Sequence, residues 1–276
     1  MNQPNAQIAP QEAGQQQIER AQEVPRENVP LPSNGLIYPK GYFLADKESV
    51  DIRAMTIRDE DLLSSEPLIR SKRAIDEFVK SALGGAVDTE IMCHGDRDAI
   101  MFAFRATGYG TDYKVKVTCP SCGESVEYEF DLSKLKIIRL QGEPLTPNTN
   151  VFEMPGALPV SGANITFSVM TVGAEKEVVK KLDALAKRAK AGVLPEVSLR
   201  LFEQIQTVDN LTKDKDAGKI RTFVDRMLAG DSRYLRKHIS DMSPKLDTKQ
   251  DMVCSRCGES SNVTLPVELS FFFPDV

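Results

Sequence analysis

Apolar side chains recur every three or four residues in several stretches of this chain, a spacing that is typical of helices with one buried face. Residues 56–83 predict a helical region that starts with Thr56 as an N-cap, with Asp59 three residues later, and stops before Gly84-Gly85. Residues 94–110 predict another helix, with Asp96 as its N-cap and a Gly-Tyr-Gly stop. Helices are therefore a major part of the fold.

Shorter segments alternate between apolar and polar residues and are punctuated by turn residues, as strands are. Such segments occur at 29–39, at 49–56 and repeatedly within 135–173. After them, amphipathic patterns predict three more helices, at 174–192, 195–210 and 216–230.

The pattern divides the chain into four parts. Residues 1–28 are rich in Gln, Asn, Pro and Glu and predict a flexible N-terminal arm. Residues 29–134 form an N-terminal α+β half, 135–215 an insertion of strands and helices, and 216–276 a C-terminal half. With 276 residues, 41% of them apolar, and no apolar run of bilayer length, we expect a globular protein without a membrane span.

A short cysteine pattern is written twice. Cys-x-x-Cys-Gly-Glu-Ser begins at Cys119 and again at Cys254, and the ungapped shift that superposes these two motifs also superposes Asp96 on Asp231. Upstream, the segment at 78–85 resembles the one at 223–230, although the first copy carries about ten extra residues before its Gly-Asp. Each copy reads helix, helix, strand, knuckle, strand, which indicates an internal duplication.

Two Cys-x-x-Cys pairs supply four thiolates, the ligand set of a structural zinc ion with Zn–S bonds of about 2.3 Å. The predicted metal ligands are Cys119, Cys122, Cys254 and Cys257. The sequence therefore predicts an α+β fold in which helices and short antiparallel strands are organised around a split four-cysteine zinc ribbon. Two alternatives are free reduced thiols and a redox pair, but neither pair opens a helix as redox motifs do. The fifth cysteine, Cys93, is expected to be a buried apolar residue.

Nothing in the sequence predicts an enzyme. A zinc ion held by four sulfurs has no open position for an activated water. The chain has two histidines, His94 and His238, and no nucleophile-elbow, P-loop, metalloprotease or dinucleotide-binding motif in its proper context. The first residues lack the basic and apolar regions of a secretory signal, so we expect the thiols to be in a reducing cytoplasm.

Five segments resemble one known family. In order, they are LPSNGLIYPKG, MTIRDEDLLSS, LIRSKRAIDEFVKSAL, GDRDAIMFAFRATGYG and VTCPSCGE. They are similar to the baseplate hub and hub-assembly proteins of T-even-type contractile-tailed bacteriophages, clearly over 29 to about 135 and weakly to the C-terminus. The resemblance implies a non-enzymatic tail protein, either built into the baseplate hub of the virion or acting on its assembly in the host cytoplasm.

Two classes of function follow from these observations. A baseplate component is expected to bind hub, tail tube or tape-measure proteins and further copies of itself. The alternative is a zinc-ribbon nucleic-acid-binding or regulatory protein. Binding nucleic acid needs a cationic stripe near the metal. A net charge of −5 and several acidic residues around the knuckles argue against nucleic acid.

Overall fold

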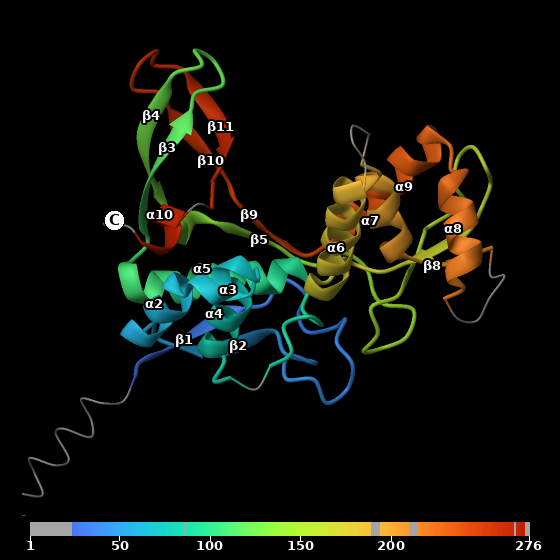
Figure 1. The fold of residues 1–276 in the computed structure, drawn as a ribbon, viewed down its shortest axis with the longest axis horizontal. Helices are drawn as coiled ribbons and strands as arrows, with labels where there is room; N and C mark the ends of the chain where they lie inside the picture. Colours follow the sequence, from blue (N-terminus) through green and yellow to red (C-terminus); the bar gives the residue numbers. More distant parts are fainter. Residues whose placement is uncertain (1–23, 86, 189–193, 210–214, 268, 274–276) are drawn as a thin grey trace, which may run out of the picture.

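The structure is a computed structural model that describes residues 24–85, 87–188, 194–209, 215–267 and 269–273. Helices and short antiparallel strands form two lobes, and a pair of β-hairpins projects from the first lobe (Figure 1). The predicted α+β class is confirmed. No helix in the described part of the chain is long and apolar enough to cross a bilayer.

The first lobe combines one small sheet with a group of helices. Strands β1 (Arg26–Pro30) and β2 (Ser49–Arg53) pair antiparallel, with Val29 opposite Val50. The helices that follow are α2 (Ile57–Ser64), α3 (Glu66–Arg70), α4 (Ala74–Ala82) and α5 (His94–Tyr109). Of the arm predicted at 1–28, residues 1–23 lie outside the described residues, and β1 already begins at Arg26.

The two predicted helix starts have different outcomes. Thr56 is the N-cap of α2 and forms a capping box with Asp59, as predicted. Asp96 is not an N-cap, because α5 begins at His94 and Cys93 takes the N-cap position. The Asp96 carboxylate instead accepts hydrogen bonds from Ser33 N at 2.8 Å and from Tyr38 Oη at 2.6 Å, so it holds the loop after β1.

Two hairpins follow the same design. The first joins β3 (Asp112–Thr118) to β4 (Ser125–Asp131), and the second joins β10 (Lys249–Val253) to β11 (Ser260–Thr264). Both are two-stranded sheets. A two-stranded hairpin is marginally stable alone, so each depends on packing against the other parts of the protein.

The second lobe contains a three-stranded sheet covered by helices. Its elements are β6 (Phe152–Glu153), β7 (Ile165–Phe167), α6 (Val172–Arg188), α7 (Glu196–Gln204), β8 (Ile205–Val208), α8 (Ala217–Asp225) and α9 (Ala229–Met242). The prediction of one helix over 195–210 is wrong after Gln204, where β8 pairs with β7. Pairing with a buried strand outweighs helical periodicity here, since Ile205 and Val208 are both β-branched and buried. The helix predicted at 216–230 is two helices.

Two connections tie the lobes and hairpins together. After the 3-10 turn at Leu132–Lys134, β5 (Lys136–Ile138) pairs antiparallel with β9 (Lys245–Asp247). The chain therefore enters the second lobe through β5 and returns from it through β9, along one two-stranded ribbon. The last described helix, α10 (Leu269–Phe272), returns to the first lobe. There Phe272 packs edge-on against Phe78 of α4, with ring centroids 5.7 Å apart.

The element order supports the predicted duplication and extends it upstream. At the shift that superposes the cysteine motifs, α5 corresponds to α9, β3 to β10 and β4 to β11. Asp231, the counterpart of Asp96, accepts hydrogen bonds from the backbone of Val160 at 2.8 Å and Ser161 at 3.0 Å. The loops that the two carboxylates hold read Leu31-Pro32-Ser33-Asn34-Gly35 and Leu158-Pro159-Val160-Ser161-Gly162. Each half therefore uses a helical aspartate to fix the same kind of loop.

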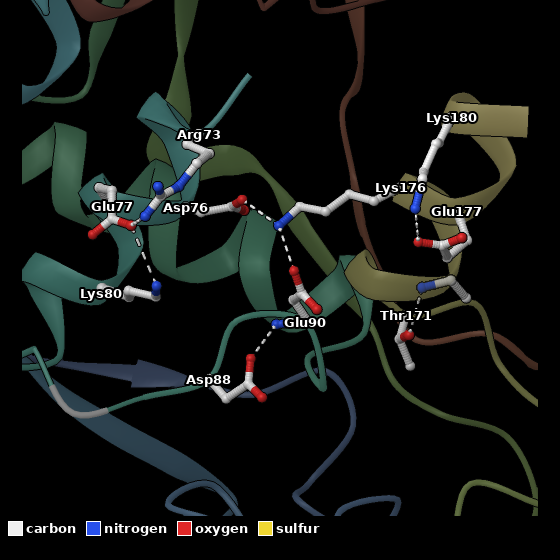
Figure 2. Close-up of polar contacts among 11 residues, drawn as sticks. Arg73, Asp76, Glu77, Lys80, Asp88, Glu90, Thr171, Lys176, Glu177 and Lys180 are labelled. Atoms are coloured by element: carbon white, nitrogen blue, oxygen red, sulfur yellow. Dashed lines mark hydrogen bonds and ion pairs between the residues drawn. The ribbon is translucent and has the colours of Figure 1, made fainter. Parts of the chain in front are cut away.

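The junction between the lobes is rich in charge. Nζ of Lys176 on α6 lies 2.6 Å from Oδ2 of Asp76 on α4 and 3.3 Å from Oε1 of Glu90 (Figure 2). Next to it, a Cβ on Gly173 would stand 3.0 Å from Glu90, so glycine permits this close approach. The Asp76 side chain is only 7% exposed, and its carboxylate therefore depends on an ammonium group from the other lobe.

Replacing Lys176 with methionine tests this junction. Lys176→Met keeps the aliphatic stem but leaves the buried Asp76 carboxylate without its partner from α6. Because Lys176 is 38% exposed, solvent screens part of the interaction, and we expect the free energy of unfolding to fall by about 1–2 kcal/mol. Chemical denaturation measures this change. Lys180→Met removes an exposed ion pair with Glu177 on the same helix and should change stability by less than about 0.5 kcal/mol; equal effects would contradict the prediction.

A second ion pair gives a pH-dependent prediction. The buried Asp59 carboxylate accepts hydrogen bonds from both terminal nitrogens of Arg53, at 2.8 and 2.7 Å. Burial opposes its ionisation, but hydrogen bonds from Arg53, Ser81 and Thr56 outweigh burial and hold the pKa of Asp59 below its ordinary value. A depressed folded-state pKa stabilises the fold above the unfolded-state pKa of about 3.9 and loses this contribution as pH falls.

Asp59→Asn should therefore lower the free energy of unfolding by about 2 kcal/mol at pH 7. The gap from the wild type should narrow as the pH falls below about 4, first because Asp59 of the unfolded chain takes up a proton and then because the folded carboxylate is protonated at its lowered pKa. Urea titrations of both proteins at several pH values measure this difference in the free energy of unfolding. Glu66→Gln, which removes an exposed pair with Arg70, is the control and should leave stability nearly unchanged. A gap for Asp59→Asn that stayed constant from pH 7 to pH 3 would show that its charge is not the cause.

Candidate metal centre

Both knuckles have the same backbone geometry. In the first, the N–H of Gly123 donates to the carbonyl of Cys119 at 2.9 Å; in the second, Gly258 donates to Cys254 at 2.8 Å. The two glycines have φ values of 74° and 73°, a left-handed conformation that favours glycine. The repeated glycine after each Cys-x-x-Cys pair thus closes a tight turn that directs both sulfurs of the pair to one side.

The four predicted ligands come together. Sγ of Cys119 lies 3.9 Å from Sγ of Cys257, and Sγ of Cys122 lies 3.9 Å from Sγ of Cys254. All four sulfurs are within 4.8 Å of one another. A tetrahedral ion with Zn–S bonds of about 2.3 Å requires S–S separations of about 3.8 Å. The four cysteines therefore fit a tetrahedral metal ion and could hold one, although the two pairs come from opposite halves of the chain.

The thiols of the cluster differ in acidity. Hydrogen bonds from the backbone N–H groups of Cys257 and Arg256 lower the pKa of Cys254 to about 7. The backbone of Glu259 favours the Cys257 thiolate, but desolvation and the neighbouring sulfurs outweigh it and raise the pKa of Cys257 to about 12. One thiolate thus forms readily while the sulfurs crowd one another, a situation that a divalent cation relieves by stabilising all four thiolates.

Cys93 lies outside the cluster. It is fully buried in the core beneath the loop after β1, where its Sγ lies 3.5 Å from Tyr38 Oη. Burial raises the pKa of its thiol well above the ordinary value, so it stays protonated. The prediction of a buried apolar cysteine is confirmed.

The surface around the cluster is acidic rather than basic. Residues 112–131 and 247–264, which contain the hairpins, carry four basic and eight acidic side chains. Cross-strand pairing neutralises part of the basic charge, as between Lys114 and Glu129 at 3.9 Å. A nucleic-acid-binding ribbon needs the opposite balance. The charge distribution therefore disfavours the nucleic-acid alternative.

Comparison with known families gives a match over residues 40–273, a span that includes both knuckles. The family is described as T4 bacteriophage base plate protein. The chain belongs to this family. It is thus a structural protein of a phage baseplate, and its location is the virion. Comparisons with curated proteins and with solved structures found no match.

Sequence reasoning found the cysteines but missed the aspartates that fix the two loops. Asp96 and Asp231 were aligned by the same shift as the cysteine motifs, yet their common role was not recognised. The signal was present in the repeated Leu-Pro and Gly of the loops at 31–35 and 158–162. Because these loops superpose at a shorter shift than the cysteines do, a single ungapped alignment does not reveal that the loops are repeated.

We expect one metal ion per chain. Cys257→Ser should abolish stoichiometric metal binding and cost several kcal/mol of stability, because binding free energy at a structural site contributes directly to folding. Elemental analysis of protein prepared without chelator, together with thermal unfolding, measures both. Cys93→Ala is the matched control and should keep the metal. Wild-type protein without metal, or an experimental structure with the cysteine pairs more than about 10 Å apart against bonds of about 2.3 Å, would contradict the prediction.

Proposed function

We propose that this baseplate protein belongs to the hub, as a non-enzymatic structural or assembly component whose hairpins are held together by zinc. The observation that carries the proposal is the convergence of four cysteines, from the two halves of the matched region, on one cluster that fits a tetrahedral ion. Such a centre fixes the geometry of a protein surface, which is what a scaffold requires. The hub assignment rests on the sequence resemblance.

Zinc suits the donor set better than other common divalent ions. Four thiolates in tetrahedral geometry favour zinc over Mg²⁺ and Ca²⁺, which prefer oxygen ligands and higher coordination numbers. Bound there, zinc would supply structural cross-linking, and four sulfurs would leave it no position for a reacting water. The proposal of a non-enzymatic role follows from this closed ligand set.

The proposed partners are other baseplate hub, tail tube or tape-measure proteins and further copies of this chain, assembled in the host cytoplasm. Tail parts combine identical subunits by rotational symmetry, so self-contacts are expected. The N-terminal residues before β1 are the proposed tether to these partners, because their composition offers little apolar surface for a core.

Deleting residues 2–23 tests the tether, since it leaves β1 intact. We expect a folded, metal-loaded protein with unchanged thermal unfolding that enters baseplates at least tenfold less efficiently. Mass spectrometry of purified particles, from a phage that carries the deletion, measures incorporation. Wild-type chain absent from purified baseplates would favour a transient assembly factor over a virion subunit. Normal incorporation of the deleted chain would instead point to the charged helical surface of residues 58–72 as the docking site.

A further inference from the structure

The second lobe contains an apolar groove. It has a volume of about 630 Å³ and lies along α8, between that helix, the start of α9 and the end of β8. Ile220, Phe223 and Met227 line it. Leu228, which also lines it, is 53% exposed. Large apolar side chains at the mouth of a groove are typical of binding sites.

The duplication explains why the groove is open. In the first lobe, α4 packs directly on α5, and the rings of Phe78 and Phe104 lie 4.6 Å apart. Phe223 is the sequence counterpart of Phe78, but it is only partly buried and faces the groove. Thus, α4 and α5 pack against each other in the first half, whereas the groove separates α8 from the start of α9 in the second.

The difference lies in the connection between the paired helices. In the first half, residues 83–93 join α4 to α5, and the described residues among them bury five side chains, those of Leu83, Val87, Thr89, Met92 and Cys93. In the second half, only residues 226–228 join α8 to α9. The connection in the second half is therefore eight residues shorter, and it lacks the buried side chains of the first at the point where the groove opens.

Size and charge restrict what the groove accepts. A volume of about 630 Å³ accommodates a few side chains, whereas a stable dimer buries about 800 Å² on each partner. The occupant is therefore a short segment and not a folded subunit. Three carboxylates also line the groove: Asp216 pairs with Lys219 at 3.6 Å, and Asp209 and Asp231 accept hydrogen bonds from backbone N–H groups. Arg226 is the lining cation that forms no ion pair with any described residue, while the connection in the first half carries Asp88 and Glu90. A carboxylate on the occupant would complement Arg226.

We propose that this groove binds a short extended segment of a neighbouring baseplate protein, apolar and carrying a carboxylate, in the place of the connection that the second half lacks. The proposal rests on the proposed scaffold function and adds to it a site and the chemistry of a partner. Seated between α8 and α9, the segment would bury Phe223, Met227 and Leu228 and complete the second lobe as residues 83–93 complete the first.

A peptide with the sequence of residues 84–93 and the change Cys93→Ser is the probe, used with the full-length protein. Fluorescence anisotropy should show saturable binding with a Kd on the order of 10–100 µM, which is typical of a short unconstrained ligand. A second peptide with Asp88→Asn and Glu90→Gln should bind at least fivefold more weakly, because it lacks the carboxylates.

Two variants of the protein locate the binding. Leu228→Ser removes apolar surface from the rim, and serine is a favoured residue at this position because Leu228 is the N-cap of α9. Arg226→Glu reverses the charge. Each should weaken binding at least tenfold with unchanged thermal unfolding. Ile57→Ser, on the 74% exposed first residue of α2 in the other lobe, makes the same kind of change away from the groove and should have no effect.

The possible outcomes separate the hypotheses. Absence of saturable binding up to millimolar peptide, or equal binding by all variants, overturns the groove proposal. A concentration-dependent dimer in sedimentation that Leu228→Ser dissociates also overturns it, in favour of a second copy as occupant. Phage that carry Leu228→Ser should incorporate the chain less than phage that carry Ile57→Ser. If the peptide binds as expected but wild-type chain is absent from baseplates and from their assembly intermediates, the scaffold function fails while the groove stands.

Discussion

Four sulfur atoms from two distant knuckles must meet at one point, and the path of the chain is arranged around this requirement. Between the knuckles the chain forms the second lobe and returns, so both ends of that excursion are brought back to the same hairpins. The antiparallel pairing of β5 with β9 is where the outgoing and incoming chain run together. Each hairpin alone has two strands and little core, so a metal ion held by the four sulfurs would give both of them a fixed position.

The first lobe is joined to the hairpins and to the second lobe by different kinds of contact. Aromatic packing dominates where α10 meets α4, α5 and β3, whereas charge dominates where α6 meets α4. At the charged junction, Lys176 lies between Asp76 and Glu90 (Figure 2). Apolar packing is insensitive to salt and pH, while ion pairs respond to both. The placement of the hairpins is therefore more robust than the placement of α6 against α4.

The sequence predicted the metal cluster and the helix boundaries that depend on local chemistry. The turn at each Cys-x-x-Cys-Gly motif and the helix cap formed by Thr56 and Asp59 involve only residues that are close in the sequence. Such local features can be predicted from the sequence alone. Prediction failed where tertiary contacts decide. Asp96 looked like an N-cap because its partners, Ser33 and Tyr38, are far away in the sequence. Likewise, Ile205–Val208 continued a helical pattern until pairing with β7 made it a strand. The groove beside α8 could be located only once both halves were seen in three dimensions.

Phe271 and Phe272 lie in the core of the first lobe, where Phe271 contacts Phe102 and Tyr113, and the backbone carbonyl of Phe271 accepts a hydrogen bond from the buried Arg105. Both residues are synthesised long after Arg105. At about 5–20 residues per second, roughly 10–30 s separate the synthesis of Arg105 from that of Phe271. The aromatic cluster of Phe102 and Tyr113 therefore lacks Phe271 until the second lobe has been synthesised. The aromatic core of the first lobe is thus completed by a segment that follows the second lobe in the sequence.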